Sequence, residues 1–137
     1  MYSDAYDLVR EILDDEQLNH YIRNLTGKHL TVIDSGPQVD TPAAKIELTG
    51  GEFNRKINTD REVNYTVSFA MPFWGADAFK QCISFLDIVL PIFFAYGSGQ
   101  DNRNIITRAV PSISENDPEK DFWIISINLT IKVFINL

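Results

Sequence analysis

The sequence predicts an α+β fold, in which a mixed or antiparallel β-sheet with long β-hairpins packs against an N-terminal helix and a central proline-kinked helix. Three features predict it: apolar residues at helical spacing near the N-terminus, a second such run before Pro91, and strict apolar alternation in later segments. The chain has 137 residues. That length suits a single domain, residues 1–137, because one core can bury most of its apolar surface.

The N-terminal segment, from Ser3 to about Leu25, has the spacing of an amphipathic helix. Its apolar residues recur at steps of three and four: Tyr6, Val9, Ile12, Leu13, Leu18, Tyr21, Ile22 and Leu25. The acidic residues 14–16 can begin a second helix, because carboxylates stabilise a first turn and Asp can cap it. One bent helix and two short helices both remain open, and Gly27 is the predicted C-terminal stop.

A long β-hairpin is predicted after a first short strand, His29–Asp34, and a polar loop. Apolar and polar residues alternate from Ala44 to Leu48 and from Val63 to Met71, which is typical of strands with one buried face. Gly50-Gly51 interrupts the first alternation and indicates a bulge or a close backbone approach. The polar triplet Asn58-Thr59-Asp60 is the predicted turn of this hairpin.

The second helical run follows Pro72 and opens at Gly75-Ala76-Asp77. Its apolar residues keep helical spacing: Phe79, Cys82, Ile83, Leu86, Val89 and Leu90. We expect this segment to be the core helix. Pro91 should kink or end it, because proline removes an intrahelical donor and clashes with the preceding turn.

A second hairpin closes the chain after Gly97–Asn104, which has the composition of a flexible loop. Ile105–Ile113 is its first predicted strand, and a turn-rich segment, residues 115–118, follows. The return strand has consecutive alternate positions that are all apolar: Trp123, Ile125, Ile127, Leu129, Ile131, Val133 and Ile135. One face of this strand should therefore be wholly buried.

The charge balance of 19 acidic against 12 basic residues gives a formal net charge of −7. Such a chain repels phosphate backbones, which argues against sequence-specific nucleic-acid binding. Cys82 is the only cysteine, so no intramolecular disulfide is expected and a reducing cytosol suits the chain. The acidic N-terminus lacks a secretory pattern. The longest apolar stretch, Cys82–Tyr96, is shorter than the roughly 20 residues of a membrane span, so we expect a soluble protein with no membrane contact.

Residues suited to catalysis or to metal or cofactor binding are few, and we expect no enzyme. His20 and His29 lack a ligand motif, which indicates surface or boundary positions and no metal site. Cys82 lies on the apolar stripe, as is typical of a buried, inert thiol. No glycine segment matches a phosphate-binding motif, so no cofactor is expected. Phe73-Trp74 and Phe93-Phe94 fit either an apolar contact patch or core packing.

The segment Thr41–Phe53 reads TPAAKIELTGGEF. It resembles the P-A-x-x-x-x-L-T-G-x-E-aromatic strand-and-bulge segment of phage tail-terminator proteins. The alternating strand that ends at Pro72, the helix with Pro91, the loop and the closing strand then follow in the order found in that family. The resemblance spans roughly Thr41 to the C-terminus, whereas the N-terminal helix agrees only in type.

The resemblance implies a structural virion protein that acts through protein contacts. It implies a homohexameric ring that caps the last ring of the tail tube, stops tube polymerisation and presents the head-joining face. The partners would be further copies of the chain, the tail-tube protein and a head-completion or connector protein, with DNA only as passing cargo. The protein would lie in the virion tail, after assembly in the host cytoplasm. Another neck or baseplate adaptor is one alternative, and a small-ligand-binding or catalytic α+β domain is a more distant one.

Closed rings arise from head-to-tail interfaces, and two polar segments suit contacts with a neighbour or a stacked ring. The first is the outer half of the long hairpin, Glu52–Arg61, which carries both charge signs and should project beyond the core. The second is the loop Gly97–Asn104. The candidate interface residues are Glu52, Phe53, Asn54, Arg55, Lys56, Asn58, Asp60, Arg61, Gln100, Asp101, Asn102 and Arg103.

Overall fold

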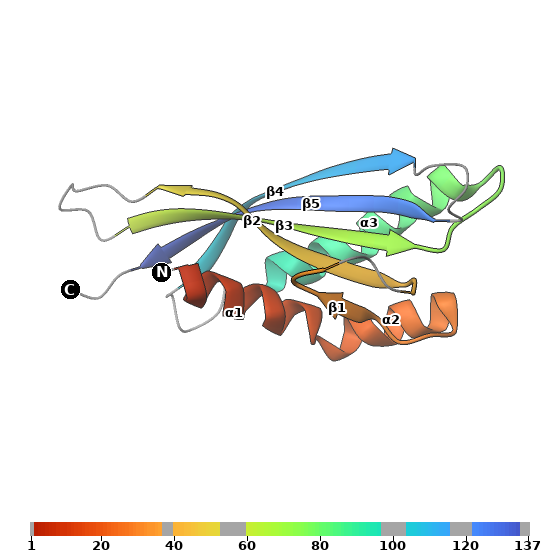
Figure 1. Cartoon of the computed structure of the whole chain (residues 1–137), viewed down its shortest axis with the longest axis horizontal. Helices are drawn as coiled ribbons and strands as arrows, with labels where there is room; N and C mark the ends of the chain where they lie inside the picture. The colour runs from red at the N-terminus through yellow and green to blue at the C-terminus, as the bar shows by residue number, and fades with distance from the viewer. Residues whose placement is uncertain (1, 37–39, 53–59, 97–103, 116–121, 135–137) are drawn as a thin grey trace.

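The computed structural model describes residues 2–36, 40–52, 60–96, 104–115 and 122–134. Its elements, in chain order, are α1 (Tyr2–Leu13), α2 (Glu16–Thr26), β1 (Thr31–Ile33), β2 (Ala43–Glu52), β3 (Asp60–Met71), α3 (Ala78–Ala95), β4 (Asn104–Glu115) and β5 (Trp123–Phe134). Helices and long strands occupy separate layers (Figure 1). The predicted α+β class is therefore confirmed.

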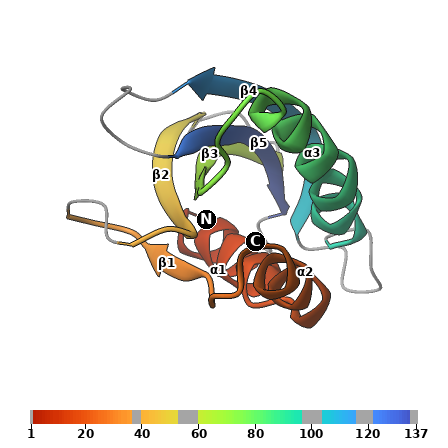
Figure 2. The ribbon, with the colours of Figure 1, turned by 90° about the vertical axis from the view of Figure 1, so that its right-hand side faces the viewer.

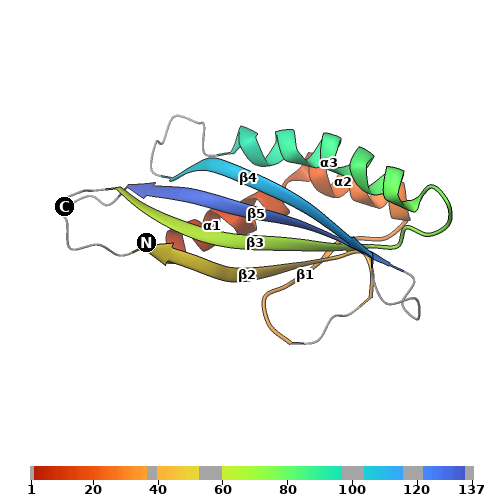
Figure 3. The same ribbon diagram turned by 90° about the horizontal axis from the view of Figure 1, so that it is seen from above.

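The strands form one sheet of five in the order β1-β2-β3-β5-β4 (Figure 3). β1 runs parallel to β2, and all other neighbouring strands are antiparallel, so the sheet is mixed. Both predicted hairpins are present, because β2 pairs with β3 and β4 with β5. β5 lies between β3 and β4, so the closing hairpin joins the first one through its return strand.

All three helices pack against the same face of the sheet (Figure 2). The Tyr6 ring of α1 lies 6.3 Å from that of Tyr65, and the Phe85 ring of α3 lies 5.1 Å from that of Phe69. Tyr65 and Phe69 are four residues apart on β3 and so point to the same side. None of the described helices covers the opposite face, as is common for antiparallel sheets.

The N-terminal segment forms two helices, which answers the question that its sequence left open. Asp15 ends the first run and caps the second, with its carboxylate accepting a hydrogen bond from the Leu18 backbone N–H at 2.9 Å. Gly27 ends α2 in the left-handed conformation, with φ of 75°, as predicted. The following strand is shorter than predicted, covering only Thr31–Ile33.

The predicted irregularity at Gly50-Gly51 is confirmed. The pairing of β2 with β3 shifts register between Leu48 and Gly50. Gly51 is also a place of close approach, because a Cβ atom there would lie 2.6 Å from the Cε1 atom of Tyr2. Because glycine has no side chain, the start of α1 can pack against the end of β2.

α3 continues through Pro91 to Ala95, so the prediction that proline could end the helix is wrong. Pro91 cannot bond to the carbonyl group of Asp87, four residues earlier. Both residues are exposed, and water can therefore hydrate that carbonyl group. The helix is then held by the apolar residues that follow, including buried Ile92 and Phe93.

One connected hydrophobic cluster joins α1, α2 and α3 to the sheet. Its centre is an aromatic group in which the Phe69 ring meets Phe85 at 5.1 Å and Phe93 at 6.3 Å, both edge-on. The buried face predicted for β5 is confirmed for Ile125, Ile127, Leu129, Ile131 and Val133. Trp123 is only half-buried, and Ile135 lies outside the described residues.

Candidate protein-interaction site

The structure describes three of the predicted interface residues. Glu52 ends β2, while Asp60 and Arg61 begin β3. The turn predicted at Asp60 is wrong, because this residue pairs with Phe134 of β5 within the sheet. The other candidates lie outside the described residues: Phe53, Asn54, Arg55, Lys56, Asn58, Gln100, Asp101, Asn102 and Arg103.

The two predicted contact segments leave the sheet at the same end. The pairs Asp60 with Phe134 and Asn104 with Val133 place the starts of β3 and β4 beside the end of β5. β2 ends there too, as Figure 3 shows. We call this end of the sheet, where β2 and β5 end and β3 and β4 begin, the arm end. The chain between β2 and β3 and the chain between α3 and β4 both connect there, although more than 30 residues separate them in sequence.

The start of α1 is fixed to the arm end by Tyr2. Its backbone carbonyl accepts a hydrogen bond from the Tyr65 hydroxyl at 2.9 Å, and its ring lies against Gly51. Desolvation by burial raises the pKa of Tyr65 above its ordinary value, so this hydroxyl stays a donor at neutral pH. The start of α1 is therefore held against the arm end of the sheet.

The helix-free face of the sheet carries a network of small polar side chains that satisfy one another. The Ser68 and Ser126 hydroxyl groups lie 2.9 Å apart, and the Thr130 hydroxyl donates to the Asn64 side-chain oxygen at 3.0 Å. Thr66 bridges the strands on either side through longer bonds of 3.3 and 3.4 Å. We call this network the polar ladder. These bonds link the side chains of β2, β3 and β5 across the helix-free face.

A hollow of about 240 Å³ opens on this face beside the polar ladder. Its polar lining includes Lys45 and Glu47, which form an ion pair at 3.4 Å, together with Ser68. Both members of the ion pair are about half exposed, so the pair adds little stability. The hollow therefore presents both charge signs and a hydroxyl group to solvent.

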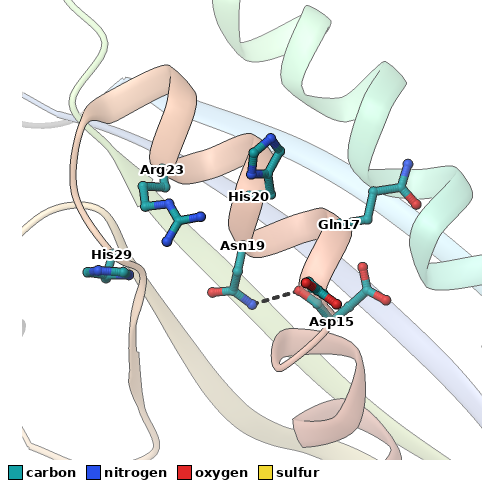
Figure 4. Close-up of a pocket in the computed structure, with 7 residues that line it drawn as sticks. Asp15, Gln17, Asn19, His20, Arg23 and His29 are labelled. Carbon is teal, nitrogen blue, oxygen red and sulfur yellow. Dashed lines mark hydrogen bonds between the residues drawn. The ribbon is translucent and has the colours of Figure 1, made fainter.

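A larger, open groove of about 640 Å³ runs between α2 and the segment before β1 (Figure 4). The side chains of Arg23 and His29 line it from opposite sides. Asn19 donates to the Leu13 and Asp15 carbonyl oxygens at 2.8 Å each, so its amide closes the turn between the two helices. His20 and His29 are both exposed, as predicted. Within the described ranges, no three His, Cys, Asp or Glu side chains gather as a metal site would require.

Asp15 also links the start of α2 to the end of α3. Its second oxygen accepts a hydrogen bond of 2.5 Å from the Tyr96 hydroxyl at the end of α3. This bond raises the pKa of Tyr96 to about 12, with burial and the negative charge of Asp15 adding to the effect. The pair therefore acts as a structural tie, because a phenol with a raised pKa is a poor general acid at neutral pH.

Cys82 is fully buried on α3, as predicted. Burial raises the pKa of its thiol to about 11. The thiolate is the reactive form of cysteine. Cys82 is therefore an unreactive core residue.

The paired aromatic residues divide between core and surface. Phe73 and Phe93 are buried, whereas Trp74 is 79% exposed and Phe94 is 44% exposed. Large exposed apolar side chains gather on or beside α3: Trp74, Phe79, Ile83, Ile88 and Phe94. A shallow groove of about 340 Å³, with Phe73 in its lining, separates α3 from α2. These side chains are the larger part of the exposed large apolar residues among those that the structure describes.

α3 is long and apolar enough to cross a membrane by length and composition alone. One side of it, with Phe85, Val89 and Phe93, is packed in the core of this domain. The exposed apolar residues lie on its other sides, so α3 contributes to both the core and the surface.

The chain matches no protein family, and it matches no curated protein sequence significantly.

Sequence reasoning missed the polar ladder and the tie between Asp15 and Tyr96. The polar residues of the ladder are visible as the alternate set in β3 and β5, opposite the apolar set. Their partners follow only from the strand register, which places Ser68 beside Ser126. No sequence signal links Asp15 to Tyr96, which lies 81 residues further along the chain.

Proposed function

We propose that this chain is a structural subunit of a closed ring that caps the tube of a phage-type tail, stops its polymerisation and presents a head-joining face. The observation that carries the proposal is the common origin of the two predicted contact segments at the arm end. Segments that start side by side can engage one partner together, such as the last ring of a tube. A partner at that end leaves the flanks of the domain for contacts between copies.

The exposed aromatic surface supports a role in binding other proteins. Trp74, at 79% exposure, is unusual for a side chain of this size in an isolated domain. Aromatic side chains are enriched at protein interfaces, where they dominate the binding energy. The cluster beside α3 is therefore a second contact surface, distinct from the arm end.

A catalytic or small-ligand-binding domain has weaker support. Asp15 is occupied by the cap of α2 and by Tyr96, and Ser68 by Ser126. The Cys82 thiol is buried with a raised pKa. The charges in the described grooves lie in open, solvated surroundings, where they lack the converging geometry that catalysis needs.

Oligomeric state in solution tests the proposal directly. We expect the purified chain to form hexamers, alone or after mixing with the tail-tube protein of the same genome, in light scattering coupled to gel filtration. Negative-stain electron microscopy should then show closed rings. A chain that stays monomeric both alone and with tubes contradicts the proposal.

The same experiment can locate the tube contact. Replacing Arg55 and Lys56 with alanine, in the predicted contact segment Glu52–Arg61 that we call the arm, should prevent capping without unfolding the domain. Alanine at Lys80 and Arg108, which are exposed on α3 and β4, removes the same charge elsewhere and should leave capping intact. Equal loss from both pairs would show a general charge effect and would argue against an arm contact.

Particles assembled without the protein separate the capping function from that of a neck or baseplate adaptor. A missing tube cap leaves polymerisation unchecked, so overlong tails should appear in electron micrographs. Tails of normal length without heads would instead favour a head-joining adaptor.

A further inference from the structure

We infer that neighbouring copies of this chain meet through an acidic face of α1 and a basic rim at the end of α2. The acidic face consists of Asp7, Glu11 and Asp14, and the basic rim consists of Arg23 and Lys28. The inference rests on the proposed ring and names the contact between its subunits. Charge is unequally distributed over the first 34 residues of the chain.

Residues 1–34 hold seven acidic and three basic side chains, a net charge of 3 − 7 = −4, which is more than half of the −7 of the whole chain. The acidic residues are Asp4, Asp7, Glu11, Asp14, Asp15, Glu16 and Asp34, and the basic ones are Arg10, Arg23 and Lys28. Asp7, Glu11 and Asp14 lie on and directly after α1, whereas Arg23 and Lys28 lie at and just past the end of α2. Of these two basic residues, Arg23 also shares the open groove with Asp15 and Glu16.

The acidic residues share one face of α1. Asp7, Glu11 and Asp14 follow at steps of four and three, which places them in one row along a helix. Asp7, Glu11 and Asp14 are all exposed, and Asp14 directly follows the last residue of α1. Like charges at these steps repel one another. Only Arg10 supplies a base on this helix, so the face keeps an excess of negative charge.

The basic rim is also exposed and borders the open groove of Figure 4. Arg23 lines that groove opposite His29, and Lys28 is the residue before His29. Among the residues that the structure describes, neither Arg23 nor Lys28 forms an ion pair, and neither do Glu11 and Asp14. Each set therefore faces solvent with its charge unmatched within the subunit.

Two unlike, complementary surfaces on one subunit suit the head-to-tail contact of a ring. In such a contact the surface that one copy presents differs from the surface that its neighbour presents. Opposite potentials across the contact guide encounter and exclude the wrong orientation. A second copy is thus the partner that carries the matching charge in the required arrangement, because each chain has one of each surface.

Charge reversal tests this pairing. Variant A carries Glu11→Lys and Asp14→Lys, and variant B carries Arg23→Glu and Lys28→Glu. In a ring made of either variant alone, like charges meet at the contact between subunits. The protein concentration at which half of the chains are assembled should therefore rise about tenfold or more. Variant A has two positive surfaces and variant B has two negative ones. A mixture of A and B should therefore assemble with alternating copies, and the quadruple variant should assemble within about threefold of the wild type.

Asp87→Lys on α3 and Arg108→Glu on β4 are the matched controls, because both residues are exposed and neither lies on α1 or α2. They should assemble like the wild type. Circular dichroism melts establish that each variant is folded, and Glu11→Gln with Asp14→Asn gives a milder replacement if variant A is not. Mass photometry measures the assembled fraction.

The outcomes separate this contact from the ring itself. If the wild type never assembles, the proposed ring is wrong. If the wild type assembles and A and B assemble equally well, the ring stands and the charged contact is wrong. Loss of assembly in A and B without recovery in their mixture also overturns the pairing, because it shows that the two surfaces do not meet.

Discussion

Replacing Asp15 should separate its two structural roles, which are to cap α2 and to hold the end of α3. One carboxylate oxygen accepts from the Leu18 N–H at 2.9 Å and the other from the Tyr96 hydroxyl at 2.5 Å. Removing an Asp cap costs about 1 kcal/mol. A hydrogen bond to a charged group contributes about 1.5 to 3 kcal/mol. The bond between Tyr96 and Asp15 should contribute about 1 kcal/mol, because it is only partly buried.

These values set the expected double-mutant cycle. Asp15→Ala should lower the free energy of unfolding by about 2 kcal/mol, and Tyr96→Phe by about 1 kcal/mol. The double variant should lose about 2 kcal/mol, because the second change removes a partner that is already gone, which leaves a coupling energy of about 1 kcal/mol. Asp15→Asn keeps a capping oxygen and should lose about 1 kcal/mol.

Urea denaturation followed by circular dichroism measures these differences. Asp14→Ala is the matched control, since this exposed neighbour caps no helix, and it should change stability by less than about 0.5 kcal/mol. Strictly additive losses for Asp15 and Tyr96 would refute the tie. A loss from Asp14→Ala as large as that from Asp15→Ala would refute the capping role.

The same pair predicts a dependence on alkaline pH. The pKa of Tyr96 is raised from 10.0 to about 12 in the folded protein, chiefly by its hydrogen bond to Asp15. The folded state therefore keeps this proton longer than the unfolded chain. The stabilisation should be fully present below pH 10 and should be lost as the pH rises towards 12. In Tyr96→Phe this part of the decline should be missing, and identical pH profiles would contradict the assignment.

Three further changes test the core and one helix end. Phe69→Ala should lower the free energy of unfolding by about 3 to 5 kcal/mol in urea denaturation, because it removes the ring at the centre of the aromatic group. A loss below about 1 kcal/mol would mean that Phe69 is not packed as described. Gly27→Ala should lower the free energy of unfolding by about 1 kcal/mol, because φ is 75° at this position, even though no atom crowds it. An unchanged urea midpoint would argue against the left-handed cap. A thiol reagent should modify Cys82 slowly until denaturant is added, because the thiol is buried and its pKa is about 11, and fast labelling of the folded protein would contradict its burial.

Periodic patterns allowed much of the fold to be predicted. The alternation in β5 identified its buried face because side chains on a strand point to opposite sides in turn. The interruption at Gly50-Gly51 identified the bulge for the same reason. Patterns of this kind are local, so they do not reveal which strands become neighbours. The insertion of β5 between β3 and β4 depends on contacts across the whole core.

The candidate site was less accessible from sequence, since its parts are brought together by the fold. The two contact segments were recognised by their polarity, but their shared position at the arm end follows from the pairing of β3 and β4 with β5. The prediction that Pro91 could end α3 was wrong, because local helix propensity does not include tertiary packing. The buried side chains of Ile92 and Phe93 stabilise the last turn of the helix. The charge separation between α1 and α2 was visible as composition only.

The position of the chain ends has a practical consequence for imaging. α1 begins beside Gly51, and β5 ends beside the start of β3, so both ends of the described chain lie at the arm end. A fluorescent protein fused to either terminus would crowd the surface through which we expect the tube to bind. The connection between Glu115 and Trp123 leaves the opposite end of the sheet. Under the proposed function, a small epitope inserted there should label the tip of a tail without blocking the tube contact.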